Sequence, residues 1–230
     1  MIVNQGKSEF VEYKNEKYAC YALRTKVVTN QDRLEDIVQE YALPYLQPGD
    51  ILFISEKMAA CTQGKAIPMS DIRPSRLACF LSRHVTRSSH GIGLSMPETM
   101  QCALNECGTM RILFSSAVSL IGKFFGQKGW FYRVAGYKAA GMDGPCSYTL
   151  PPYNHYVVPA PDKPGKVAAD LARSLNQTAV LIVDINDLGG AILGSSEPRH
   201  SNKKYEQLLR QNPLGQENQQ TPMGILRPVK

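Results

Sequence analysis

The chain has 230 residues, of which 43% are hydrophobic and 20% charged, and its formal net charge is +6. This balance is ordinary for a globular protein, and the length suits one large domain or two small ones. No apolar run is long enough for a membrane span, and the first residues lack the basic and then apolar pattern of a signal peptide. We therefore expect a cytoplasmic protein that does not contact a membrane.

The distribution of charged residues, cysteines and histidines argues against two further classes of protein: nucleic-acid-binding proteins and proteins with a structural zinc site. A positive charge attracts nucleic acid or phosphorylated small molecules, but the basic residues are scattered and no helix-turn-helix or RNP-type signature is present. Nucleic acid is therefore not an expected partner. The six cysteines include no CxxC pair and the four histidines do not cluster, so we expect free thiols and no structural zinc site.

The N-terminal segment predicts strands and then a helix. Loose alternation of polar and apolar residues in 1–28 indicates one or two strands. Apolar residues at helical spacing predict a helix over about 31–43, with Thr29 and Asn30 as a cap and Pro44 at its end.

A lysine follows the next predicted strand. A turn at 47–50 leads into a short buried strand at 51–55, and Lys57 comes just after it. The ordinary interpretation is that Lys57 exits to solvent. The functional alternative is a point charge aimed at a phosphate, with Gly64 allowing a tight turn beside it.

The middle of the chain predicts two helices and a strand. Helices are expected over 74–84 and from 96 to about 107, because apolar residues recur on one face and proline lies near each start. Residues 112–125 are largely apolar, and a turn separates them from a predicted strand at 130–135.

A carboxylate lies between glycines after this strand. In the sequence AGMDGP, Asp143 lies between Gly141 and Gly144, and Pro145 comes next. The ordinary interpretation is a type I or II turn. Residues 149–158 are rich in proline and tyrosine, and we expect an ordered loop there.

The C-terminal part predicts a helix that leads into a buried strand. Residues 166–175 have helical spacing, and the aliphatic run at 179–184 fits a strand buried on both faces. A short amphipathic helix is expected at 203–210 and a closing strand within 221–227.

The buried strand is expected to end on a second carboxylate, Asp184. Asn186, Asp187, Gly189 and Gly190 follow it. One interpretation is a simple Asn/Asp/Gly turn. The other is a hard-cation site, because carboxylate and amide oxygens are suitable ligands and bare glycine backbone lets a ligand approach closely.

Taken together, these pieces supply what a metal–nucleotide site needs. Asp143 and Asp184 offer oxygen ligands and Lys57 offers a cation. Neither a GxxxxGK[ST] loop nor a GxGxxG motif after a strand is present, so the common nucleotide-binding folds are not supported.

The ordered set of motifs resembles a known family, the CofE-like gamma-glutamyl ligases that extend the deazaflavin coenzyme factor 420. The resemblance covers about residues 40–227. The matching segments, in chain order, are GDILFISEK at 49–57, AGMD at 140–143, VLIVD at 180–184, and a Gly-Gln pair at 215–216 followed by Thr-Pro at 221–222.

This resemblance implies an α+β fold in one CofE-like domain over 1–230, with room for two subdomains, and a homodimer. It implies GTP or ATP as co-substrate and Mg²⁺ or Mn²⁺ as the cation. By position, the metal ligands are Asp143 and Asp184, with Asn186 or Asp187 supplying a further oxygen. The implied nucleotide-binding residues are Lys57, Gly215 and Gln216.

The chain departs from the family pattern near these residues. Cys61 and Gln63 replace a second lysine and an acidic residue, and residues 144–146 read Gly-Pro-Cys where the family has Ser-Asn. Three hypotheses follow. The first is a ligase that joins glutamate or another amino acid to a small carboxylate through an acyl phosphate. The second is a catalytically inactive nucleotide- or metabolite-binding protein. The third is a nucleotide hydrolase or phosphotransferase.

Overall fold

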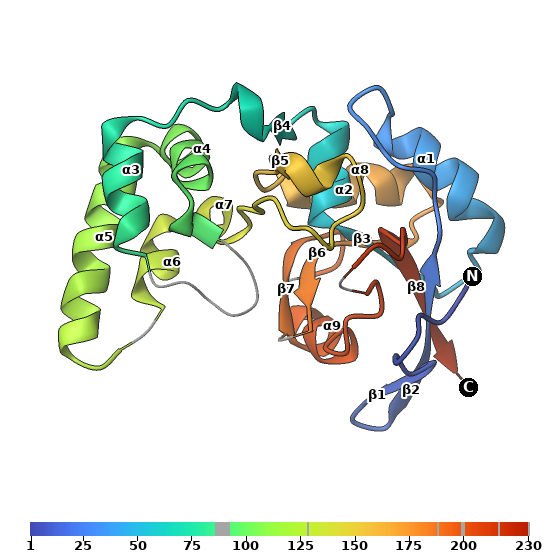
Figure 1. Cartoon of the computed structure of the whole chain (residues 1–230). Helices are drawn as coiled ribbons and strands as arrows, with labels where there is room; N and C mark the ends of the chain where they lie inside the picture. Colours follow the sequence, from blue (N-terminus) through green and yellow to red (C-terminus); the bar gives the residue numbers. More distant parts are fainter. Residues whose placement is uncertain (86–92, 128, 188, 199–200, 216, 230) are drawn as a thin grey trace. The chain divides into compact units, whose positions relative to one another are not determined.

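The computed structural model describes residues 1–85, 93–127, 129–187, 189–198, 201–215 and 217–229. The chain forms two compact units (Figure 1). Unit 1 comprises Met1–Gly64 and Pro161–Lys230, and unit 2 comprises Lys65–Ala160. Helices and a mixed sheet together give the expected α+β fold.

Unit 1 is built on a six-stranded sheet with the order β1-β2-β8-β3-β6-β7. The pair β3–β6 is parallel, and every other neighbouring pair in this sheet is antiparallel. The strands are β1 (Phe10–Tyr13), β2 (Glu16–Leu23), β3 (Ile51–Ser55), β6 (Ala179–Asn186), β7 (Gly189–Ser195) and β8 (Met223–Val229).

Helices cover both faces of this sheet, which explains the continuous apolar runs in β3 and β6. Alternate residues of β6 enter different cores: Val180 and Ile182 pack on one side, Leu181 and Val183 on the other. The helices on the first side are α1 (Leu34–Tyr41), α2 (Glu56–Thr62) and α8 (Pro164–Ser174), and α9 (Asn202–Leu208) packs on the second. The prediction that the run at 179–184 is buried on both faces is confirmed.

The start of α1 differs from the prediction. Thr29 and Asn30 do not cap it; the N-cap residue is Arg33, which makes no side-chain capping bond. Instead, the carboxylate of Asp32 accepts hydrogen bonds from the backbone N–H of Thr29 at 2.8 Å and from its hydroxyl at 3.1 Å. The polar groups of Thr29 are therefore used in a local turn with Asp32 and do not cap the helix.

Unit 2 is mainly helical around a separate apolar core. Its helices are α3 (Arg76–Arg83), α4 (Pro97–Cys107), α5 (Thr109–Phe124), α6 (Trp130–Ala135) and α7 (Tyr137–Ala140), and a small antiparallel pair joins β4 (Ile67–Pro68) to β5 (Tyr156–Val157). Short 3₁₀ turns complete the two units: η1 (Leu43–Tyr45), η2 (Met69–Asp71), η3 (Gly93–Ser95) and η4 (Tyr153–His155). The predicted helices at 74–84 and 96–107 are confirmed.

The predicted strand at 130–135 is wrong, because this segment is α6. Glycines with positive φ, Gly129 and Gly136, flank it and set its limits. The Trp130 ring lies against Gly122 of α5, where an added Cβ would come within 3.0 Å of the ring. A short aromatic run fits a strand or a helix equally in sequence, and packing against α5 decides the outcome.

No helix among the described residues is both long and apolar enough to cross a membrane.

Candidate functional site

The central feature of unit 1 is the parallel pair β3–β6, whose carboxyl ends meet at one edge. Ser55, the last residue of β3, is paired with Val183. Ser55 also caps α2, because its hydroxyl accepts a hydrogen bond from the N–H of Met58 at 3.2 Å. In open α/β sheets, ligands bind beyond the carboxyl ends of parallel strands, so this edge is the candidate site.

Lys57 lies at this edge, as the second residue of α2. It is half-buried, and its neighbour Glu56 is buried. Its place directly after the strand is as predicted from the sequence. Contact with a phosphate stays a prediction.

Asp184 lies in β6, opposite Ala191 of β7, and is half-buried. The strand continues to Asn186, so the expectation that it ends on Asp184 is wrong. Because side chains alternate along a strand, Asp184 and Asn186 share the face that carries Ile182. This is the face against which α2 packs.

The glycines after Asp187 have a structural role that the sequence interpretation missed. Gly189 and Gly190 begin β7 and pair with Asn186 and Ile185 in a hairpin. A Cβ at Gly190 would lie 2.4 Å from a methyl group of Ile185 and 2.7 Å from the backbone oxygen of Asp184. The bare backbone at Gly190 therefore accommodates the neighbouring strand.

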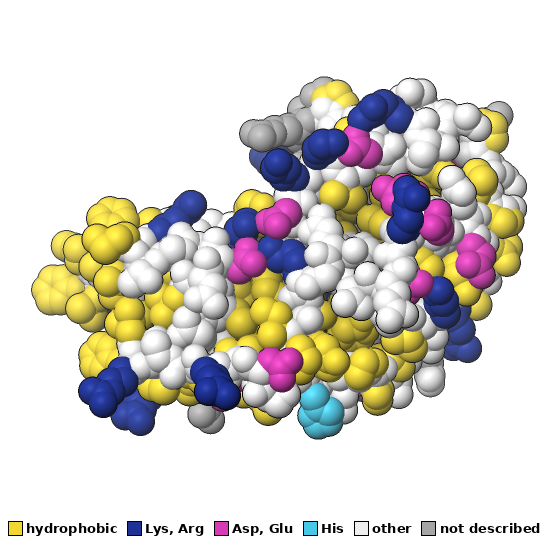
Figure 2. Space-filling model, turned by 90° about the horizontal axis from the view of Figure 1, so that it is seen from above, with side chains coloured by type: hydrophobic (Ala, Val, Ile, Leu, Met, Phe, Trp, Pro, Cys, Tyr) yellow, Lys and Arg dark blue, Asp and Glu magenta, His cyan; other side chains and the backbone are white. Residues whose placement is uncertain are grey.

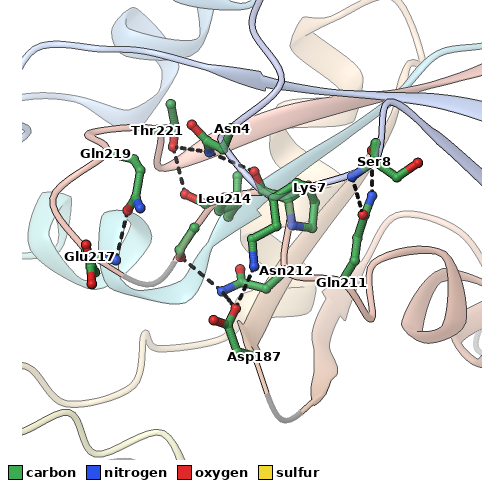
Figure 3. A network of polar contacts seen from close by, with 12 residues as sticks. Asn4, Lys7, Ser8, Asp187, Gln211, Asn212, Leu214, Glu217, Gln219 and Thr221 are labelled. Carbon is green, nitrogen blue, oxygen red and sulfur yellow. Dashed lines mark hydrogen bonds and ion pairs between the residues drawn. The ribbon is translucent and has the colours of Figure 1, made fainter.

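Asp187, in the β6–β7 turn, joins three segments of the chain (Figure 3). Its Oδ1 accepts hydrogen bonds from Lys7 Nζ at 2.8 Å and from Asn212 Nδ2 at 3.0 Å. The hydrogen bond from Lys7 is the main cause that lowers the pKa of the Asp187 carboxyl; burial opposes it, and the hydrogen bond from Asn212 adds a smaller lowering effect. Lys7 and Asn212 were not singled out in the sequence, where no local pattern marks them.

Replacing Lys7 with methionine should raise the pKa of the Asp187 carboxyl, because it removes the largest of the interactions that lower this pKa. A lowered carboxyl pKa stabilises the fold above the unfolded pKa, and this stability is lost as the pH falls through the folded pKa. Because the Asp187 side chain is half-exposed, the change in unfolding free energy should stay under about 1 kcal/mol. Carboxyl NMR titration measures the shift.

The control for this titration is Lys203→Met, which removes an exposed cation from α9. An Asp187 pKa that Lys7→Met leaves unchanged would contradict the assigned cause.

The segment from Asn212 to Thr221 is held by polar contacts at both ends. Asn212, which is fully buried, donates from Nδ2 to the carbonyl oxygen of Gly215 at 3.0 Å. Asn4 donates to the carbonyl oxygen of Pro213 and to the hydroxyl of Thr221, which in turn donates to the carbonyl oxygen of Leu214. The N-terminal segment thus fixes the loop that precedes β8 (Figure 3).

Gly215 has a φ of +82°, and an added Cβ would lie 2.6 Å from the Gln219 side chain. Its local role is therefore conformational. Gln216, the other predicted nucleotide-binding residue here, lies outside the described residues.

Asp143 belongs to unit 2. Its backbone forms an isolated antiparallel bridge with Val158, with N···O distances of 3.0 and 2.9 Å, and its side chain is half-buried. The type I or II turn predicted from Asp143 is wrong: residues 144–146 form no turn, and Asp143 pairs instead with the segment that follows η4. Ligation of a metal by Asp143 stays a prediction.

The departures at Cys61 and Gln63 have local explanations. Cys61 is buried in α2. Gln63 ends this helix and exchanges two hydrogen bonds with the backbone of Asp162, at 3.1 and 2.7 Å. Where the family pattern has charges, Cys61 therefore contributes to packing and Gln63 hydrogen-bonds the backbone of Asp162.

The family resemblance implies a divalent cation. Among the described residues, no group of three or more His, Cys, Asp and Glu side chains is placed to hold a metal ion. Asp184 and Asn186 nevertheless offer a carboxylate and an amide oxygen from one face of β6, and Mg²⁺ prefers oxygen ligands. These two donors fit the implied cation, whereas the Asp187 carboxylate is already engaged by an ammonium group.

The fold and these side chains define an α+β protein with a polar candidate site at the end of its parallel strand pair. The protein-family model described as F420-0:Gamma-glutamyl ligase matches residues 22–188. The chain therefore belongs to the F420-0:gamma-glutamyl ligase family. A search of curated proteins found no match. Lys7 and Asn212 both lie outside the matched residues.

Proposed function

We propose that this protein is a nucleotide- and divalent-metal-dependent ligase that joins an amino acid, with glutamate the first candidate, to a small-molecule carboxylate. The single observation that carries the proposal is the family match over residues 22–188, which includes β3, Lys57, Asp143 and β6. A small-molecule substrate and a nucleotide agree with the family's ligase activity.

The proposed reaction has two steps. The substrate carboxylate attacks the terminal phosphate of GTP or ATP, which gives an acyl phosphate and the nucleoside diphosphate. The amine of the amino acid then attacks the acyl carbon, which forms the amide, releases inorganic phosphate and gives up a proton. Such phosphoryl transfer depends mainly on positioning and on neutralising charge.

The residues of this chain have separate roles in the proposal. Asp143 and Asp184 would hold Mg²⁺ or Mn²⁺, with a further oxygen from Asn186 or Asp187. Such a cation would supply positive charge that offsets the negative charge of the phosphates. Lys57 neutralises further phosphate charge as a point cation.

Two further segments have separate roles in the proposal. The backbone at Gly215 and Gln216 would lie along the nucleotide. Residues 148–156, which include the 3₁₀ turn η4, are a candidate wall that would keep water from the acyl phosphate. We also expect a homodimer, which light scattering after size-exclusion chromatography tests.

The test combines the protein with GTP or ATP, Mg²⁺ or Mn²⁺, L-glutamate and a panel of small carboxylates that starts with F420-0. Phosphate release and the mass of the amide product are measured. We expect an amide product whose formation requires nucleotide, cation and amino acid together, and which Asp184→Ala abolishes.

The residues at 144–146 favour one alternative, a binding protein that keeps the fold without catalysis, since Gly-Pro-Cys replaces polar residues of the family pattern. Saturable nucleotide binding by calorimetry, without product over the whole panel, would support this alternative. Phosphate release that proceeds without any amine would indicate a hydrolase instead.

A further inference from the structure

Unit 2 exposes a continuous apolar face on its longest helix, α5. Its outward side chains recur every three or four residues, which places them on one side of the helix. We call this set the apolar stripe; it consists of Met110, Leu113, Phe114, Ala117, Leu120, Ile121 and Phe124. The opposite side of α5 contributes Ile112, Ser115 and Gly122 to the interior.

The exposure of the apolar stripe is unusual in extent. Phe124, Met110 and Leu120 expose 85%, 79% and 71% of their surface. Large apolar side chains at such exposure each present on the order of 100 Å². The stripe is therefore at or above the ~300–600 Å² of the largest apolar patch on a typical monomer, and approaches the ~800 Å² that one partner contributes to a standard interface.

Spacing points to a helix as the covering element. Met110, Leu113, Ala117, Leu120 and Phe124 follow one another at intervals of three, four, three and four residues. This is the a/d spacing by which one helix packs along another. A helical partner would fill the gaps between these side chains over about four turns.

The charge of unit 2 indicates which kind of helix would bind the apolar stripe. Unit 2 contains ten Lys and Arg against four Asp and Glu, so it carries the entire net charge of +6. No acidic residue occurs between Glu106 and Asp143, a stretch with five basic residues. Figure 2 shows hydrophobic side chains gathered at its left-hand end, where α5 lies in Figure 1, with Lys and Arg side chains at their edge.

A second copy would bring the same positive charge to this face. In an antiparallel pair, Arg111 of one helix would approach Lys123 of the other, and both residues are exposed. An acidic partner would be attracted instead, and complementary charge favours both encounter and selectivity. We propose that the apolar stripe of α5 binds an amphipathic helix of another protein whose apolar seam is flanked by acidic residues. This inference is independent of the ligase activity.

The probe is a synthetic three-heptad peptide with leucine at a and d and glutamate at e and g, where mutual repulsion opposes its self-pairing. The comparison peptide has lysine at e and g. Fluorescence anisotropy with the full chain should show the glutamate peptide binding at least tenfold more tightly at low salt. Added salt should reduce the difference in affinity between the two peptides, because it screens exposed charges.

Variants on α5 test the surface itself. Phe124→Asp and Leu120→Asp should each weaken binding of the glutamate peptide at least tenfold. Gln127→Asp is the matched control, because it adds the same charge at an exposed position beyond the stripe and should change binding less than threefold. Circular dichroism should be the same for all variants, since the replaced side chains are exposed.

Three results would overturn the proposal. One is equal or tighter binding of the lysine peptide. Another is a Phe124→Asp variant that lowers the molar mass of the protein in light scattering, since a second copy would then cover the stripe. The last is binding to phosphatidylserine vesicles that Phe124→Asp abolishes while neither peptide binds.

Discussion

Replacing Asp184 with alanine is expected to lower cation-dependent nucleotide affinity and phosphate release by about 100-fold or more, because loss of one fixed group that acts on phosphoryl charge has effects of this order. The side chain is half-buried on β6, one residue beyond the pairing of Val183 with Ser55. Truncation there removes an oxygen donor without opening the cores on either side of the strand. The fold should therefore persist. Calorimetry with GTP and Mg²⁺, with and without a chelator, measures the affinity.

Companion variants make this test specific. Asp184→Asn keeps the shape and removes the charge, so it should resemble Asp184→Ala. Asp143→Ala should cause a similar loss. Asp170→Asn is the control, because it removes a half-buried carboxylate that pairs with Lys166 on α8. Unchanged nucleotide affinity in both Asp143→Ala and Asp184→Ala would show that the site assignment is wrong.

Asp187→Asn separates two roles of Asp187. If its part is to anchor Lys7 and Asn212, an amide retains a hydrogen-bond acceptor and the nucleotide affinity should fall only severalfold. A loss as large as that of Asp184→Ala would place Asp187 among the metal ligands instead.

The buried elements of unit 1 were predictable because burial leaves a strong pattern in sequence. Strand β3 has the predicted limits, and α8 leads into β6 as expected. Both strands are continuous aliphatic runs, which a sheet covered on two faces requires. The same logic failed at α6, where six residues are too few to show a period and the contact with Gly122 decides the conformation.

The polar part of the site was predictable only in pieces. Asp184 and Lys57 stand directly beside the strands that position them, so their places follow from the local sequence. The contacts of Asp187 do not: Lys7 is 180 residues away along the chain, and Asn212 is 25. The strand pairing at Gly190 could not be predicted either, because a glycine beside a ligand and a glycine beside a neighbouring strand cannot be distinguished in sequence.

Breaking the buried ion pair near the start of β3 should cause the largest loss in the free energy of unfolding. Asp50, whose side chain is 1% exposed, accepts hydrogen bonds from Arg227 of β8 at 2.9 and 2.7 Å and from the backbone N–H of Gln47 at 2.8 Å. The same guanidinium group donates to the carbonyl oxygen of Tyr45 at 2.7 Å. These contacts tie η1, the turn before β3, and the closing strand together.

Arg227→Met is therefore expected to lower the free energy of unfolding by about 3 kcal/mol, the lower end of the range for removing one partner of a buried pair. The lower end applies because the Arg227 side chain keeps 20% of its exposure, and water can reach the carboxylate that is left. In a chain of this size, such a loss corresponds to a melting point lower by roughly 6–12 °C. Thermal and urea unfolding measure it.

The double variant Asp50→Asn/Arg227→Met separates the buried charge from lost packing. With no carboxylate to leave unpaired, it should be more stable than Arg227→Met alone, because removing both charges avoids the desolvation penalty that removing one incurs. A double variant that is less stable than the single would mean that the guanidinium bond to Tyr45 and the aliphatic packing of Arg227 carry the effect. A single variant as stable as the parent chain would mean that water satisfies Asp50 at no cost.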